Sequence, residues 1–167
     1  MVKTRALKRF DRVPPINQSV DTLYLSRKKV SDDIIDLIVD ETLMWCIETF
    51  GNNDKKEIPN IVWYWNTTGE KEMDKEFIAT YNLESNEISV KIRGHRTAKK
   101  LIRTIIHEYI HYLQPTKGGW YERWNDELGY SKNPYEIEAY YLSDLYENCA
   151  NSDIMNKVFK LVPSSNG

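Results

Sequence analysis

Hydrophobic residues recur with helical spacing in some parts of the chain and cluster as strand-forming runs in others. Between Ser31 and Gly51, isoleucine, leucine and methionine recur every three or four residues, which is typical of a helix with one buried face. A serine hydroxyl can accept a hydrogen bond from the first free amides of a helix, and a glycine commonly ends one. The pattern therefore predicts a helix over residues 31–51.

The segments that follow favour strands. Residues 61–65 read Ile-Val-Trp-Tyr-Trp, and residues 77–83 and 87–92 are also rich in β-branched or aromatic side chains. Ser85-Asn86 lies between the last two segments and suits a tight turn. We therefore expect three strands, the second and third forming a hairpin.

Helical spacing returns after Gly94 and predicts a helix over residues 97–114. Residues 115–133 contain one proline and three glycines, so we expect a loop there with at most one short helical turn. Proline suits the first turn of a helix, which places the next helix from residue 134 to about 148, and a last short helix covers residues 153–161. The order of these elements predicts a small α+β domain with an N-terminal helix, a three-stranded sheet and further helices.

Composition adds the domain organisation. The chain has 167 residues, 41% of them hydrophobic and 29% charged, which is typical of one soluble globular domain. Residues 1–30 are basic and contain two adjacent prolines, so we expect a partly ordered arm followed by a single domain over residues 31–167. The net charge of −2 argues against nucleic-acid binding driven by overall charge.

Two further features bear on location. No apolar run reaches the roughly 20 residues that span a bilayer, and the N-terminus lacks the apolar stretch of a secretory signal. We therefore expect a cytoplasmic protein that does not enter a membrane. Cys46 and Cys149 are far apart in the sequence, and each is interpreted as a small buried residue.

The predicted helix over residues 97–114 carries the pattern H-E-x-x-H, formed by His107, Glu108 and His111. Side chains four residues apart lie one above the other on a helix, so both imidazoles can reach one metal ion. The intervening glutamate is displaced by about 100° and can touch a water molecule on that ion. Apolar residues occupy the opposite side of this helix, which predicts that it buries one face and presents the histidines to a cleft.

A catalytic zinc ion usually has three protein ligands and one water molecule. The chain has three histidines, and the remaining one, His95, precedes the helix, so a carboxylate is the expected third ligand. Glu136 and Glu138 are available at the start of the next predicted helix, and Asp126 is a more distant candidate.

H-E-x-x-H followed by E-x-x-A on a later helix resembles the gluzincin branch of the zincin metallopeptidases, including compact minigluzincins and ImmA/IrrE-type peptidases. The resemblance covers residues 31–148 and implies that Glu136, three residues before Ala139, is the third ligand. Many relatives place Asp or Asn four residues after that glutamate, where this chain has Tyr140. The helical wheel offers Glu138 as the alternative, since it shares an arc with apolar residues.

These residues together predict a zinc-dependent metallopeptidase that acts on a peptide or protein substrate. Zinc lowers the pKa of its bound water, and Glu108 is the expected general base that accepts the proton of that water. The resemblance implies that Tyr130 stabilises the oxyanion, because relatives often have Tyr or His there. Tyr112 and Tyr121 are the alternatives for that role.

Two other functions stay open. Zinc could staple a small non-catalytic binding module, or the arm at residues 1–30 could lie across the cleft and keep a peptidase latent. The basic stretch over residues 91–103 is interpreted as a solvated face, with a subsite for an acidic substrate as the alternative. Trp120 and Trp124 are interpreted as packing residues, with the lining of a substrate groove as the alternative. The resemblance to gluzincins implies that an edge strand holds an extended substrate, and the strand at residues 87–92 is the candidate.

Overall fold

The computed structural model describes residues 23–26, 30–65 and 78–162 and confirms the predicted α+β fold. The elements follow one another in the order α1 (Asp32–Phe50), β1 (Asn60–Tyr64), β2 (Ala79–Asn82), β3 (Glu87–Lys91), α2 (Ala98–Leu113), α3 (Trp120–Leu128), α4 (Pro134–Ser143), α5 (Tyr146–Ala150) and α6 (Asp153–Phe159). Short 3₁₀ helices, η3 (Ile92–Gly94) and η4 (Tyr130–Lys132), precede α2 and α4.

The three strands form one sheet in the order β1-β3-β2. β2 and β3 pair antiparallel as the predicted hairpin, whose turn ends at Asn86 with a φ of 49°. β1 runs parallel to β3 on its other side. The segment expected to be an edge for substrate pairing, residues 87–92, is therefore the central strand, and that expectation was wrong because β1 takes the place beside it.

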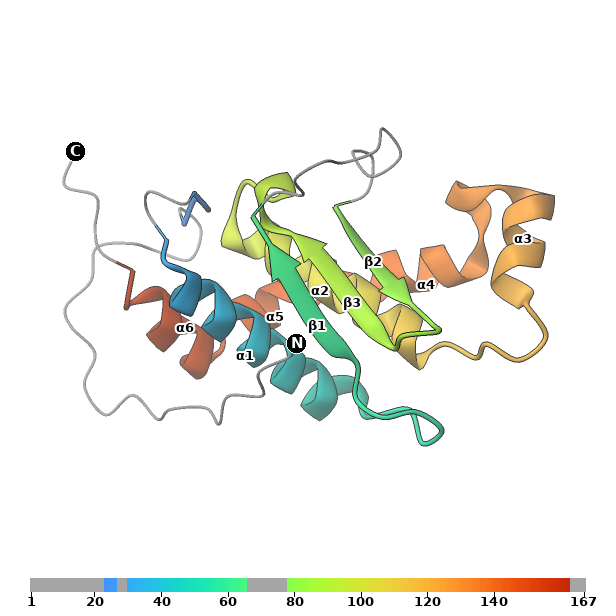
Figure 1. Ribbon diagram of the computed structural model, residues 1–167, viewed down its shortest axis with the longest axis horizontal. Coiled ribbons are helices and arrows are strands. Elements are labelled where there is room, and N and C mark those ends of the chain that lie inside the picture. The colour runs from blue at the N-terminus through green and yellow to red at the C-terminus, as the bar shows by residue number, and fades with distance from the viewer. Residues whose placement is uncertain (1–22, 27–29, 66–77, 163–167) are drawn as a thin grey trace.

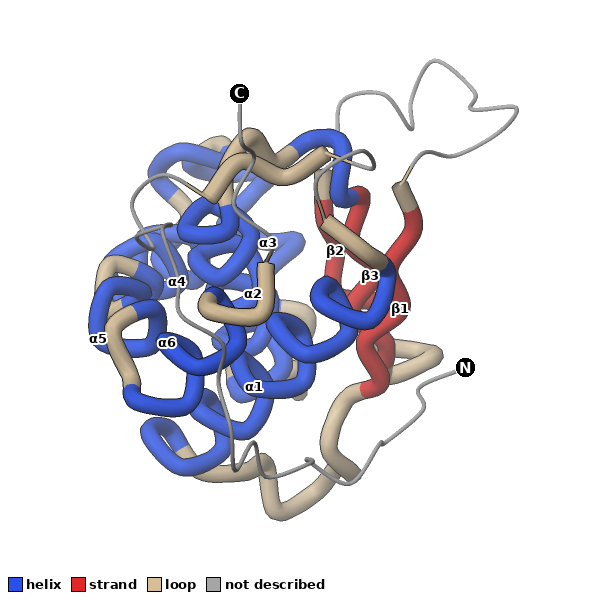
Figure 2. The backbone as a smooth tube through the Cα atoms, turned by 90° about the vertical axis from the view of Figure 1, so that its left-hand side faces the viewer, coloured by secondary structure: helices blue, strands red, loops and turns tan. Residues whose placement is uncertain are grey.

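Helices cover one face of the sheet, as the side view shows (Figure 2). α2 lies directly behind the strands and also contacts α1, α4 and α5 (Figure 1). Its apolar residues are almost all fully buried, including Leu101, Ile102 and Ile105. The Thr97 hydroxyl caps its first turn by accepting a hydrogen bond from the amide of Lys100 at 3.3 Å. The helix that carries H-E-x-x-H is thus held rigidly by the core.

Two helical segments differ from the prediction. Residues 120–128 were expected to lie in a loop, but they form α3. The glycines of this segment stand at the two ends of the helix and not inside it: Gly119 has a φ of 63° and Gly129 a φ of 79°. The helix expected to run to residue 148 ends at Ser143, and the chain turns before α5. The Ser143 hydroxyl donates to the carbonyl of Tyr140 at 2.9 Å, an alternative to continued helix bonding.

The described part of the predicted arm contacts the domain. Leu23 is buried, and its carbonyl accepts a hydrogen bond from the amide of Ala98 at 3.1 Å. Residues 1–22 and 27–29 of that arm, and Phe77 of the second predicted strand, lie outside the described residues. Cys46 and Cys149 are both buried with free thiols, as the sequence indicated. No helix in the described part of the chain is long and apolar enough to cross a membrane.

The packing of α2 predicts a large difference between two isoleucines. Ile105 is fully buried, whereas Ile137 on α4 is 54% exposed. We expect Ile105→Ala to lower the free energy of unfolding by about 2–5 kcal/mol, because it removes buried methyl groups and leaves a cavity. Ile137→Ala serves as the control and should change it by less than about 1 kcal/mol. Urea unfolding followed by circular dichroism measures both, and equal effects would contradict the described packing of α2.

Candidate metal centre

α4 packs against α2 and places the side chain of Glu136 beside that helix. The buried residues of α4 are Glu136, Ala139 and Ser143, which are spaced three and four apart and therefore share one face. The small side chains at the last two positions let the two helices approach closely. Asn133, fully buried, starts α4: its side-chain oxygen accepts from the amide of Tyr135 at 3.0 Å.

His107, His111 and Glu136 converge on one point. The Nε2 atoms of the two histidines are 3.1 Å apart. The Glu136 carboxylate lies 3.2 Å from each of them, through Oε2 to His107 and through Oε1 to His111. His107 and Glu136 are buried, with Glu136 only 2% exposed, and His111 is partly buried. The sequence analysis thus named three residues that the fold brings together from two different helices.

The three residues offer donor atoms close enough together for one metal ion. Taking one ligand atom from each residue, these atoms all lie within 4.8 Å of one another. Two imidazole nitrogens and a carboxylate oxygen are also a ligand set that zinc accepts. The group formed by His107, His111 and Glu136 can therefore hold a metal ion.

Gln114, at the end of α2, orients His111. Its amide nitrogen donates to the carbonyl of Tyr135 and to the Glu138 carboxylate, each at 2.8 Å. Its oxygen therefore faces Nδ1 of His111 at 2.8 Å, so Nδ1 carries a proton and Nε2 is the ring nitrogen that faces the cluster. Glu138 contacts Gln114 and does not contact the histidines. The sequence analysis missed Gln114, although its position three residues after His111 places it on the same side of the helix.

Tyrosines surround the carboxylate of Glu136. The Tyr121 hydroxyl donates to Oε1 of Glu136 at 2.6 Å. The Tyr140 ring lies against His107, with 4.5 Å between ring centroids, so the tyrosine that departs from the family pattern packs directly on a histidine of the cluster. The Tyr130 hydroxyl lies 3.4 Å from that of Tyr140. Burial raises the pKa of Tyr130, and its hydrogen bonds to Tyr140 and Glu136 raise it further, so it is protonated at neutral pH.

Glu108 lies beside this cluster and is also buried. Burial raises its pKa, while the positive character of His111 and His107 opposes the rise. The pKa of the neighbouring Glu136 moves the other way: burial would raise it, but hydrogen bonds from the two histidines and Tyr121 hold it far below its usual value. Two carboxylates a short distance apart are thus given different proton affinities by their surroundings.

His111 belongs to the same hydrogen-bond network as Glu136. Burial lowers the pKa of His111, but its hydrogen bond to Glu136 outweighs that effect and the pKa is raised overall. Glu108 and Gln114 contribute to the rise. The buried negative charge of Glu136 is thereby balanced within the cluster, which is how proteins accommodate a buried carboxylate.

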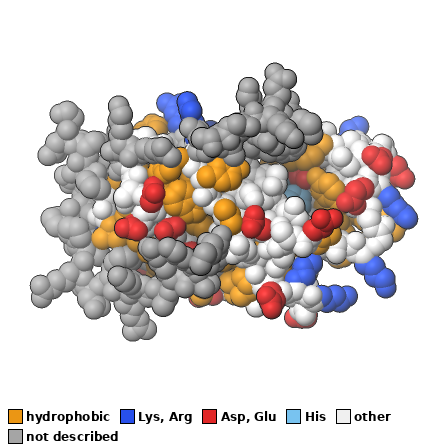
Figure 3. Space-filling model, in the orientation of Figure 1, with side chains coloured by type: hydrophobic (Ala, Val, Ile, Leu, Met, Phe, Trp, Pro, Cys, Tyr) orange, Lys and Arg blue, Asp and Glu red, His pale blue; other side chains and the backbone are white. Residues whose placement is uncertain are grey.

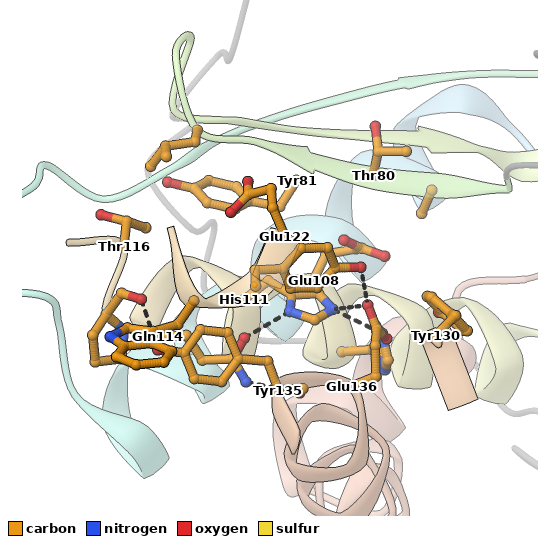
Figure 4. Close-up of a pocket in the computed structure, with 16 residues that line it drawn as sticks. Thr80, Tyr81, Glu108, His111, Gln114, Thr116, Glu122, Tyr130, Tyr135 and Glu136 are labelled. Carbon is orange, nitrogen blue, oxygen red and sulfur yellow. Dashed lines mark hydrogen bonds and ion pairs between the residues drawn. The ribbon is translucent and has the colours of Figure 1, made fainter. Parts of the chain in front are cut away.

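A cleft gives access to the cluster. A cavity of about 330 Å³ is lined by His107, Glu108, His111 and Glu136, together with residues of β2 and α3. Figure 4 shows Thr80 and Tyr81 of β2 along one wall, with His111 and Glu136 opposite. In the space-filling view a histidine is visible from solvent between hydrophobic and acidic side chains (Figure 3). β2 is an edge strand of the sheet that the described strands form, and Ala79, Thr80 and Tyr81 of β2 line this cleft.

Other sequence candidates lie elsewhere. His95 is buried, with Nδ1 2.9 Å from the carbonyl of Lys91 and Nε2 2.9 Å from the hydroxyl of Thr104. The Tyr112 hydroxyl accepts from the amide of Asn53, away from the cleft. Of the two tryptophans proposed for a groove, Trp120 lines the cavity and Trp124 packs on Tyr135. Asp126 is exposed on α3 and does not belong to the cluster.

Comparisons of this chain with protein families, with curated proteins and with solved structures found no match. The resemblance to gluzincins therefore rests on the motif residues of the sequence alone.

The arrangement predicts different effects for the two glutamates of α4. Glu136→Gln removes a charged oxygen donor from the cluster, so we expect zinc affinity to fall by more than the roughly 10- to 100-fold that losing a supporting partner costs. Glu138→Gln keeps an oxygen that can accept from Gln114, and we expect affinity close to that of the unaltered chain. Competition with a chromophoric chelator measures both variants. Loss of zinc from Glu138→Gln alone would contradict the arrangement.

Proposed function

We propose that this protein is a zinc-dependent metallopeptidase. The observation that carries the proposal is the convergence of His107, His111 and Glu136 in a cleft, with the buried carboxylate of Glu108 beside them. A structural zinc site is closed by four protein ligands, whereas a catalytic site has three and keeps one position for water or substrate. A three-residue ligand set that borders a cavity supports the catalytic alternative.

The roles of the side chains follow from this arrangement. Zinc, when bound, lowers the pKa of a water molecule and polarises the scissile carbonyl. Glu108 accepts the proton of the attacking water and delivers it to the leaving amine. Its raised pKa suits that task, because a general base works best when its pKa lies near the working pH.

Tyr130 is the proposed donor to the oxyanion. It lines the cavity, and its side chain is 49% exposed at the cleft mouth. Tyr121 also lines the cavity, but it is less exposed, and its hydroxyl donates to Glu136 at 2.6 Å. The greater exposure of Tyr130 favours it for the oxyanion, and the short hydrogen bond gives Tyr121 the task of orienting the carboxylate of Glu136.

The edge strand β2 supports a peptide as the substrate. An extended peptide can add to an exposed sheet edge through main-chain hydrogen bonds. Thr80 and Tyr81 border the cavity from this strand, and the amide of Tyr81 also bonds to Glu108. A peptide laid along β2 would therefore pass directly over the general base.

The decisive variant is Glu108→Gln, which keeps the size of the side chain but cannot accept a proton. We expect hydrolysis of a quenched-fluorescent peptide library to fall by about 10²–10⁴-fold, with zinc content unchanged. Glu84→Gln, on the exposed hairpin turn, is the matched control. Cleavage by Glu108→Gln at the rate of the unaltered protein would refute this mechanism.

The same assay separates the alternatives. A zinc-loaded protein that cuts no library member, yet unfolds when a chelator removes the ion, is a non-catalytic zinc-stapled module. A protein that becomes active only when residues 1–22 are deleted is a latent peptidase. Cleavage by the full chain that is unchanged by the deletion excludes latency.

Tyr130 has its own test. We expect Tyr130→Phe to lower kcat by about 10²-fold without changing zinc affinity, because it removes a donor that acts on charge developing in the transition state. Tyr141→Phe is the control, since Tyr141 is 76% exposed on the neighbouring helix. Steady-state kinetics on one cleaved peptide measures both. An unchanged kcat in Tyr130→Phe would assign the oxyanion to another donor.

A further inference from the structure

The cleft continues past the metal cluster toward the start of α2. A second cavity of about 590 Å³ shares His107, Glu108 and Tyr130 with the first and extends to Lys100 and Arg103. The cluster therefore lies between two halves of one cleft, and a peptide that crosses it must enter both.

The two halves differ in charge. Among the described residues that line the second cavity, the lysine and arginine are Lys100 and Arg103, and the one carboxylate is that of Glu108 in the candidate site. The described part of the first cavity's lining has no lysine or arginine and contains Glu122 from α3. An acidic group on a substrate is thus favoured in one half and repelled in the other.

The two cations are held differently. Arg103 pairs with Asp144 at 2.7 Å and lies over the ring of Tyr146. Lys100 is exposed, and no carboxylate of the described residues lies within ion-pair distance of it. The adjacent Lys99 pairs with Glu147 at 3.6 Å and does not line the cavity. Lys100 is therefore the cation best able to take a new partner.

The rise of α2 determines how far Lys100 and Arg103 lie from the metal cluster. Lys100 and Arg103 precede His107 by seven and four residues, which puts their backbones about 10 Å and 6 Å along the helix axis from it. An extended peptide advances about 3.3 Å per residue. Lys100 and Arg103 therefore lie level with substrate residues about two or three positions away from the peptide bond that lies over the metal cluster.

We propose that Lys100, supported by Arg103, forms a specificity subsite for a carboxylate of the substrate, two or three residues from the scissile bond. This inference rests on the proposed peptidase function and adds the substrate class, peptides with an acidic group on one side of the cut. The carboxylate can belong to an aspartate or glutamate side chain or to the C-terminus of the peptide, and the test separates these sources.

The experiment uses the full, zinc-loaded protein and paired peptides that differ by Glu against Gln at one position on either side of the cut. Each pair is made with a free and with an amidated C-terminus. We expect the glutamate peptide to have a kcat/KM about three- to fivefold higher at one position, the scale of an exposed ion pair. The preference should decrease at 1 M NaCl, where such pairs are screened.

Variants assign the effect to the subsite. Lys100→Gln should bring the Glu/Gln ratio to about one, while cleavage of the glutamine peptide stays unchanged. Lys99→Gln, the matched control, should keep the ratio. Asp144→Asn frees Arg103 from its partner and should raise the ratio. An effect that follows the free C-terminus and not the side chain would identify the terminal carboxylate as the group that is bound.

Two results overturn the proposal in distinguishable ways. If the protein cleaves peptides but shows no Glu/Gln preference that depends on Lys100 with either terminus, the subsite is wrong and the peptidase function stands. If no peptide is cleaved although zinc is bound, the proposed function fails, and the subsite fails with it.

Discussion

The buried carboxylate of Glu136 is the constraint on which the candidate site depends. Removing a carboxylate from water costs several kcal/mol unless its oxygens are paired. Here both oxygens face imidazole nitrogens, and the Tyr121 hydroxyl donates to one of them. α4 and α2 are therefore coupled through one charge that neither helix could bury alone. A metal ion bound to the same donors would meet the same requirement.

This constraint explains the composition of both helices. α4 presents Ala139 and Ser143 to α2 beside Glu136, because only small side chains let the carboxylate reach the histidines. α2 in turn buries one side in the core and presents His107 and His111 on the other side to the cleft. Gln114 extends the network by fixing the ring of His111.

Much of this was predictable from the sequence, because local patterns specify local structure. The α2 helix, the β2–β3 hairpin and the pairing of His107 with His111 depend on residues close in the chain. The order of the strands depended on long-range pairing, and the edge was therefore assigned to the wrong strand. α3 was not predicted, because in the sequence a glycine at the end of a helix looks the same as a glycine in a loop.

The choice between Glu136 and Glu138 shows a limit of helical wheels. The wheel favours Glu138 because apolar residues share its arc, yet Tyr141 on that arc is largely exposed. α4 is buried through small and polar residues instead, so hydrophobicity did not mark its inner face. The resemblance pointed to Glu136 through the spacing E-x-x-A, which does not depend on how apolar the neighbouring residues are.

The core position of α2 also bears on selectivity. Lys100, Arg103 and the two histidines project from one helix whose apolar residues are almost entirely shielded from solvent. The spacing between the cationic end of the cleft and the metal cluster is therefore fixed by the helical rise and does not depend on a mobile loop. Under the proposed function, the protein therefore cannot adjust this distance to a substrate by moving a loop. In the proposal, the same rigid element that brings the two histidines to Glu136 also sets the distance from them to the carboxylate of the substrate.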